Sequence, residues 1–350
     1  MASLKDPLRG DHVSCLLRQV LLLLVGAAPL YACFPLSKSG ERPRIPEEDL
    51  PGLTLLTPGE NASFQNPAWS PDGRSLAYDF ANPPIGASRD GFPTDAEIYV
   101  MDLETGTRRQ LTDNDLADVE PDWSPDGREI VFVRSSEQAA YPPPLELMLI
   151  GVDSDFEQVL LECPGPCVGP KWSRDGEFIA IGMGEGIWTI RRDGSDLRQV
   201  SGEKVTAATY PGWSPDGKRL VYWASLEAIS VSQAERADLA VLDLSSGEET
   251  VVLSGISPWK PDWSPLGSSI LYSDQASPQI QWALFTLDLE TGVGRRLIPH
   301  DLEYDLFDAV WSPDGNRIAF AYGFESTTSH LYILDLAELG DLTPEPTSGP

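Results

Sequence analysis

The chain has 350 residues and a formal net charge of −29, from 25 basic and 54 acidic side chains. A surface this acidic repels phosphate backbones, so we expect no nucleic-acid partner. The sequence holds three histidines and four cysteines. That supply disfavours a metal site built from histidine clusters, and we expect neither a metal ion nor an organic cofactor.

Residues 1–32 have the order of a signal peptide, in which basic residues precede a short apolar run at 20–30. The run is too short to span a bilayer. It ends in Leu-Tyr-Ala-Cys at 30–33, which is similar to bacterial lipoprotein signals. That resemblance implies a lipid on Cys33 and an extracytoplasmic place, anchored to a bacterial membrane in the periplasm or at the cell surface. An ordinary signal peptide cut near Ala32 is the alternative.

The segments that flank the rest of the chain are expected to lack regular structure. Residues 33–52 contain four prolines among charged residues without any periodicity, so we interpret them as a flexible tether behind the lipid. Residues 338–350 combine proline, glycine and polar residues, and we expect a disordered tail.

A Trp-Ser-Pro-Asp-Gly motif recurs along the chain at intervals of 41 to 54 residues. Its proline presets the turn and its glycine supplies a positive φ, so each copy predicts a tight turn between two strands. Arg174 replaces the proline in one copy and Leu266 replaces the aspartate in another. The six copies begin at Trp69, Trp123, Trp172, Trp213, Trp263 and Trp311.

Each motif is followed by an uninterrupted apolar triplet, such as Ile130–Phe132, and then by a further strand pair, such as 98–102 and 108–112. Continuous apolar triplets suit a strand that is covered on both faces. Four strands in each of six repeats predict an all-β, six-bladed β-propeller over residues 53–337. Because the sixth repeat lacks an outer strand, we expect Leu53–Thr57 to complete the last blade and close the ring.

The motif, with its downstream Tyr-Val-Met-Asp-Leu strand at 99–103, resembles the TolB-type, WD40-like propeller repeat. The same repeat builds the propellers that precede the hydrolase domain in prolyl oligopeptidase-like enzymes. The resemblance implies the fold over nearly the whole chain but does not specify a function, which depends on loops added to the fold.

Cys163 and Cys167 flank Pro-Gly-Pro in the loop before the third motif. Outside the cytoplasm, two cysteines this close in sequence most often form a local disulfide. We therefore expect them to be bonded.

The sequence contains no Gly-x-Ser-x-Gly nucleophile motif. We therefore expect a non-catalytic, monomeric propeller that binds a protein or an envelope polymer. The alternative is a glycan-active enzyme that uses carboxylates in the central funnel, because acidic pairs for such chemistry are not excluded.

Long, irregular connections are expected to collect on one face of the ring, around the ends where the inner strands begin. Variable loops on a rigid scaffold are usual sites of recognition. Trp259 is an aromatic residue where two other repeats have Val119 and Thr209, and local packing is the alternative to binding there. The residues expected at this partner-binding face are Gln65, Asn66, Asp118, Glu120, Tyr210, Trp259, Lys260, Phe307 and Asp308.

Overall fold

The structure is a computed structural model of the 350-residue chain. Cys33, the expected lipid site, and the expected signal peptide lie outside the described residues, as does most of the expected tail. The residues that the structure describes are 45, 50–59, 61–82, 95–135, 144–202, 207–225, 237–256, 259–275, 282–298, 305–323 and 328–339.

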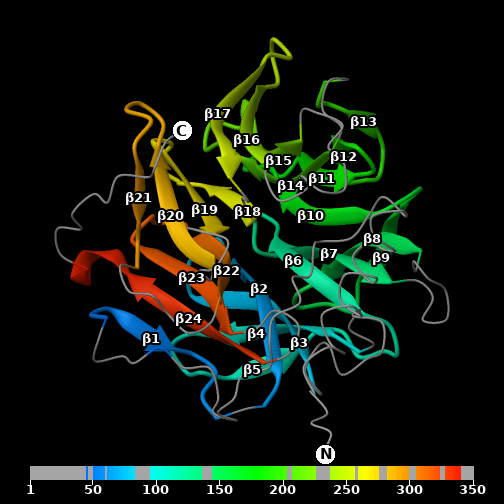
Figure 1. Ribbon diagram of the computed structural model, residues 1–350. Coiled ribbons are helices and arrows are strands. Elements are labelled where there is room, and N and C mark those ends of the chain that lie inside the picture. Colours follow the sequence, from blue (N-terminus) through cyan, green and yellow to red (C-terminus); the bar gives the residue numbers. More distant parts are fainter. Residues whose placement is uncertain are drawn as a thin grey trace, which may run out of the picture.

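Six four-stranded antiparallel sheets surround a central axis (Figure 1), which confirms the predicted six-bladed propeller. Blade 1 comprises β2 (Ser63–Trp69), β3 (Ser75–Ala81), β4 (Glu97–Asp102) and β5 (Arg108–Gln110). Blade 2 comprises β6 (Asp118–Trp123), β7 (Glu129–Ser135), β8 (Leu145–Gly151) and β9 (Glu157–Glu162). Blade 3 comprises β10 (Cys167–Trp172), β11 (Phe178–Met183), β12 (Gly186–Arg191) and β13 (Arg198–Gln199).

Blade 4 comprises β14 (Ala207–Trp213), β15 (Arg219–Ser225), β16 (Ala237–Asp243) and β17 (Glu249–Ile256). Blade 5 comprises β18 (Trp259–Trp263), β19 (Ser269–Gln275), β20 (Trp282–Asp288) and β21 (Gly294–Arg296). Blade 6 comprises β22 (Asp305–Trp311), β23 (Arg317–Gly323), β24 (Ser329–Asp335) and β1 (Leu53–Leu55). The first-named strand of each blade is the innermost, and a short 3-10 helix, η2 (Leu336–Glu338), follows β24. Within the described residues, no helix is long and apolar enough to cross a membrane.

The N-terminal strand closes the ring as predicted. β1 pairs antiparallel with β24, with Leu53 opposite Leu334, and the two strands lie side by side in Figure 1. Ile45 and Leu50, which fall within the expected tether, are buried in the same blade. The Ile45 amide also donates to the Tyr332 hydroxyl at 3.1 Å. Ile45 and Leu50 therefore belong to the packed body of the protein.

The apolar triplets form the second strand of each blade and are buried on both faces, because neighbouring sheets cover them. In β7, Ile130, Val131 and Phe132 are all fully buried. Trp123 packs against Ile98 of the preceding blade. The motif tryptophans therefore hold neighbouring blades together, and this packing uses their large apolar area.

The motif turns lie together at one end of the channel, and a proline of one blade packs near the glycine of the next. A Cβ added to Gly127 would lie 3.8 Å from Pro71, and one added to Gly176 would lie 3.7 Å from Pro125. Gly217 is different, because a Cβ there would meet nothing within 4 Å. The preceding blade carries Arg174 where the others carry proline, so the ring of proline–glycine contacts has a gap between blades 3 and 4.

Candidate functional site: the axial cavity

Every innermost strand bulges three residues before its motif tryptophan. The pairing of each inner strand with the second strand shifts there, as between Gln65 and Ala68 in blade 1. Proline follows the bulged residue in five blades and cannot donate to the ladder, which favours the bulge. The bulged residues all have a φ between 41° and 60°: Asn66, Glu120, Gly169, Tyr210, Lys260 and Asp308.

A left-handed backbone costs free energy at any residue with a Cβ, and five of the six bulged residues have one. The bulge places these residues around the axis, where they line a cavity of about 40 Å³. The motif is repeated from blade to blade, but the bulged residue is different in each. The scaffold is therefore uniform and the cavity lining is varied, as expected for a recognition site.

The ammonium group of Lys260 lies among three acceptors and an aromatic ring. Its Nζ lies 2.8 Å from Asp308 Oδ1 and 3.5 Å from Glu120 Oε1, and it donates to Asn66 Oδ1. The same nitrogen lies 5.1 Å from the centre of the Tyr210 ring, a cation–π arrangement. Burial alone would lower the pKa of Lys260, but Asp308 and Glu120 more than offset it, so the pKa is raised.

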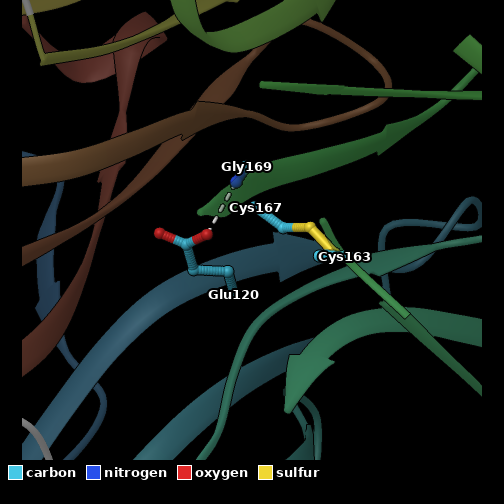
Figure 2. The surroundings of a disulfide bond; sticks show 4 residues. All are labelled: Glu120, Cys163, Cys167 and Gly169. Carbon is cyan, nitrogen blue, oxygen red and sulfur yellow. Dashed lines mark hydrogen bonds between the residues drawn. A yellow bond between two sulfur atoms is a disulfide. The ribbon is translucent and has the colours of Figure 1, made fainter. Parts of the chain in front are cut away.

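The carboxylates of the cavity also join neighbouring blades. Glu120 Oε2 accepts from the Gly169 amide of the next blade at 2.6 Å, and Figure 2 shows its side chain pointing toward β10. Asp308 Oδ2 accepts from the Asn66 amide at 3.1 Å in the same manner. Amide groups freed by the bulges are thus satisfied across the blade junctions.

Asp79 in β3 lies just outside this ring and is nearly fully buried. Its Oδ1 accepts from Asn66 Nδ2 at 2.6 Å and from the Glu120 amide at 3.2 Å. Within the described residues its Oδ2 is buried without a hydrogen-bond partner. Burial raises the pKa of Asp79 to about 7, although the Asn66 hydrogen bond and Lys260 oppose the rise.

A second set of charges lies one step closer to the turns. Lys171 Nζ lies 3.0 Å from Asp122 Oδ1. Asp262 Oδ2 accepts from the Trp311 amide at 2.8 Å, and its pKa is raised by burial despite the nearby Lys171. Counting both levels and Asp79, five carboxyl groups in the described structure surround two ammonium groups. Carboxyl groups therefore outnumber ammonium groups at the axis.

The structure brings together five of the nine residues expected at the binding face, and all five line the cavity: Asn66, Glu120, Tyr210, Lys260 and Asp308. Gln65 is buried beside the bulge, opposite Asp79. Asp118 is buried in an ion pair with Arg134, with oxygen–nitrogen distances of 2.6 and 2.7 Å. The side chain of Trp259 lies outside the described part of the structure.

The expected place of Phe307 at the rim of the funnel is wrong. Phe307 packs in the core with Phe64 and Tyr78. It precedes the bulged residue, and side chains alternate between the two faces of a strand. The residue that lines the cavity is therefore Asp308, and Phe307 lies between blades 6 and 1.

Sequence reasoning missed Asp79, Asp122, Lys171 and Asp262. Asp122, Lys171 and Asp262 could have been found by aligning the six repeats on their motif tryptophans. The residue directly before the tryptophan is Ala, Asp, Lys, Gly, Asp and Val in turn. A charged residue at an otherwise apolar or small position marks the axis. Asp79 has a similar signal, since the other blades have Val, Gly, Trp, Ser and Ala at its position.

A disulfide lies near the cavity in sequence, because Cys167 comes two residues before the bulged Gly169. Cys163 and Cys167 are joined by a disulfide at the start of β10, with their Cα atoms 6.2 Å apart (Figure 2). Nowhere in the described ranges do three or more His, Cys, Asp or Glu side chains form a group that could hold a metal ion. Ammonium groups are instead the cations among the carboxylates.

No protein-family model matches the chain. Among curated proteins, it is 31% identical to the uncharacterized peptidase YuxL of Bacillus subtilis over 175 residues, which are 50% of this chain and 24% of that protein. It is 22% identical to dipeptidyl-peptidase 5 of Porphyromonas endodontalis, covering 91% of this chain and 46% of that protein. It is also 26% identical to the TolB homolog of Chlorobium luteolum, covering 46% of this chain and 34% of that protein. The chain spans less than half of each of these relatives.

Solved structures share the propeller fold. A putative TolB from Agrobacterium tumefaciens matches with a TM-score of 0.57 and 20% identity, over 72% of this chain and 88% of that one. Oligogalacturonate lyase in complex with manganese matches with a TM-score of 0.53 and 18% identity, over 81% of this chain and 93% of that one. Pyrococcus horikoshii acylaminoacyl peptidase matches with a TM-score of 0.52 and 17% identity, over 81% of this chain and 46% of that one.

These relatives overturn the expectation of a non-catalytic scaffold, because the chain is similar to peptidases along up to 91% of its length. The absence of a nucleophile motif concerns only the chemistry of a hydrolase unit. It carries no information about a propeller that serves such a unit, or about carboxylates at the axis. The six repeats, the closed ring and the similarity to TolB proteins in sequence and structure agree, and the chain is a TolB-type β-propeller.

Proposed function

We propose that the chain acts in peptide hydrolysis, as the propeller through which a peptidase binds its peptide substrate. The similarity to dipeptidyl-peptidase 5 supports this, since it covers 91% of this chain but only 46% of that protein. Peptide-bond cleavage is assigned to a hydrolase unit of the kind that accompanies such propellers. The axial cavity is assigned to binding the peptide.

The observation that carries the proposal is the arrangement of groups around the axis. Buried carboxylates and the Tyr210 ring already hold an ammonium group, that of Lys260. Peptides offer ammonium groups at their N-termini and on lysine side chains. A peptide is therefore a chemically matched ligand for the cavity.

Isothermal titration of the full chain with short peptides tests the binding step, and mass spectrometry of the same mixtures tests whether cleavage accompanies it. We expect binding that weakens at least about tenfold in Tyr210→Ala, as for a central interface aromatic. Asp193→Asn, at an exposed turn of blade 3, is the matched control and should bind as the wild type does. Wild-type affinity in Tyr210→Ala would contradict the proposal.

A second candidate is an acid–base enzyme acting on an acidic or neutral glycan. Oligogalacturonate lyase supports it, because 93% of that enzyme is matched by the propeller alone. The carboxyl of Asp79 has a pKa of about 7, which suits proton transfer near neutral pH. Degradation of oligogalacturonides by the full chain that is lost in Asp79→Asn, without peptide binding, would favour this candidate over the first.

We further propose that the protein works outside the cytoplasm, anchored by a lipid on Cys33 and working as a monomer. The apolar run and the Leu-Tyr-Ala-Cys ending support the anchor, and the Cys163–Cys167 disulfide supports an oxidising compartment. Mass spectrometry of the mature N-terminus should find an acylated Cys33. An unacylated form that begins near Phe34 would contradict the anchor. Alkylation without reduction should leave Cys163 and Cys167 unlabelled, because they form the disulfide.

A further inference from the structure

We propose that the axial cavity is a receptor for a primary ammonium group of the ligand, and that Lys260 moves toward Asp79 when the ligand enters. The receptor consists of Asp308, Glu120 and the Tyr210 ring. This inference rests on the proposed function, because it names the part of a peptide that the cavity recognises.

The contacts of Lys260 define the receptor. Two carboxylates lie 2.8 and 3.5 Å from its ammonium nitrogen, and an aromatic ring lies 5.1 Å away. These groups come from blades 6, 2 and 4, while Lys260 comes from blade 5. An ammonium on any stem that reaches the axis would find the same partners, because each of them recognises the charge and not the stem.

Asp79 supplies the place to which Lys260 can move. Asn66 lies between the two, since its Oδ1 accepts from Lys260 and its Nδ2 donates to Asp79 Oδ1 at 2.6 Å. In the described structure the other oxygen of Asp79 is buried without a partner, and such an atom gains most from a new donor. A displaced Lys260 would supply that donor. The ammonium group of the ligand could then enter without forcing the charge of Lys260 out of the protein interior.

The size of the cavity narrows the ligand. Its volume of about 40 Å³ accommodates a few water-sized groups, at roughly 10–15 Å³ for each. An ammonium group and the carbon next to it fit, but a folded chain does not. The ligand therefore enters with one narrow end, which is either the N-terminal amine of a peptide or a lysine side chain.

Chemical rescue tests the receptor without any peptide. In Lys260→Ala the internal ammonium is removed, and the melting temperature should fall because Asp308 and Glu120 remain buried without it. Ethylammonium and butylammonium chloride should then raise the melting temperature of this variant more than sodium chloride does at equal concentration. If Lys260→Ala does not fold, Lys260→Met keeps the packing and allows the same comparison. The matched control is Lys218→Ala, at an exposed lysine of a motif turn.

Peptide titrations against the wild-type chain distinguish the two sources of the ammonium. If the N-terminal amine binds, N-acetylation should weaken binding at least about tenfold; if a lysine side chain binds, replacement by norleucine should do so. Asp79→Asn should also weaken binding, because the displaced Lys260 loses its carboxylate. Asp153→Asn, at an exposed carboxylate, should leave the affinity unchanged.

The outcomes separate this inference from the proposed function. Equal effects of alkylammonium and sodium salts on Lys260→Ala would overturn the receptor, even if peptides bind elsewhere on the chain. Rescue by alkylammonium without binding of any peptide would keep the receptor and remove the peptidase assignment. Peptide binding that survives blocking of both kinds of ammonium would overturn the inference and leave peptide binding standing.

Discussion

At the scale of single residues, the buried carboxyl of Asp79 makes the stability of the fold depend on pH. Asp79 has a pKa of about 7 in the folded protein because of burial, whereas an unfolded aspartate titrates near about 3.9. Between these values the folded state binds more protons than the unfolded state. The contribution of Asp79 to stability should therefore fall as the pH rises from about 4 to about 7.

Asp79→Asn tests this dependence. The amide keeps an oxygen for Asn66 and the Glu120 amide but removes the buried charge. We expect the variant to gain stability relative to the wild type as the pH rises from 5 to 8, because only the wild type must ionise a buried group. Urea denaturation at both pH values measures this difference. A constant difference between the two proteins would contradict the assignment.

The motif turns show how one side chain stabilises a local structure. In blade 2, Asp126 Oδ1 accepts from Ser124 Oγ at 2.7 Å and from the Arg128 amide at 3.1 Å. These hydrogen bonds, that of Ser124 first, hold the pKa of Asp126 below its usual range. In blade 5 the equivalent residue is Leu266, whose side chain is largely exposed. The turn persists there because the Gly267 amide still donates to the Ser264 carbonyl at 2.8 Å.

Leu266→Asp should therefore stabilise the protein by about 1 kcal/mol, the contribution of one net hydrogen bond. Chemical denaturation measures the change. The reciprocal substitution Asp216→Leu, in blade 4, should destabilise by a similar amount since it removes the same bonds. Equal stability of the wild type and Leu266→Asp would show that repulsion from the added negative charge cancels the stabilisation by the new hydrogen bonds in the turn.

Individual elements explain which parts of the fold the sequence predicts well. The second strands are predicted because their apolar triplets are continuous, and the turns because proline and glycine occupy fixed positions. The bulge in each inner strand is not predicted, because it depends on pairing with the second strand. That bulge decides whether residue 307 or residue 308 reaches the axis, and the sequence-based expectation includes both.

The closing strand is the element on which the ring depends. Deleting residues 53–57 removes β1 and leaves the edge of β24 unpaired. We expect the melting temperature to fall by more than about 5 °C, because an open edge and the apolar surface under Leu53 become exposed. Differential scanning calorimetry measures the shift. An unchanged transition would contradict a closed ring in solution.

The gap in the proline–glycine ring offers a second test at this scale. Arg174→Pro should raise the melting temperature by about 1–3 °C, because it restricts the unfolded chain and adds the missing contact near Gly217. Arg174→Ala is the control that separates loss of the charge from gain of the ring contact. A lower melting temperature in the proline variant than in the alanine variant would show that the turn of blade 3 does not accept the conformation that proline has in the other blades.

The whole molecule combines a repeated frame with an axis that is different in every blade. The repeated frame, a four-stranded blade with its motif turn, can be predicted from the sequence because it recurs six times. The axial site is only partly readable, because its members lie up to 242 residues apart, as Asn66 and Asp308 do. The repeats place both residues at one face of the ring, but a single sequence gives no sign of the hydrogen bond between them. The function is less readable still, since the peptidase relationship comes from the relatives.

The most direct test of the central claim is a crystal structure of the full chain with a bound peptide that has a free N-terminus and a lysine side chain. The account predicts an ammonium group of the peptide between Asp308 and Glu120, over the Tyr210 ring, with Lys260 displaced toward Asp79. A peptide bound only on the outer surface of the blades, with the contacts of Lys260 unchanged, would contradict it.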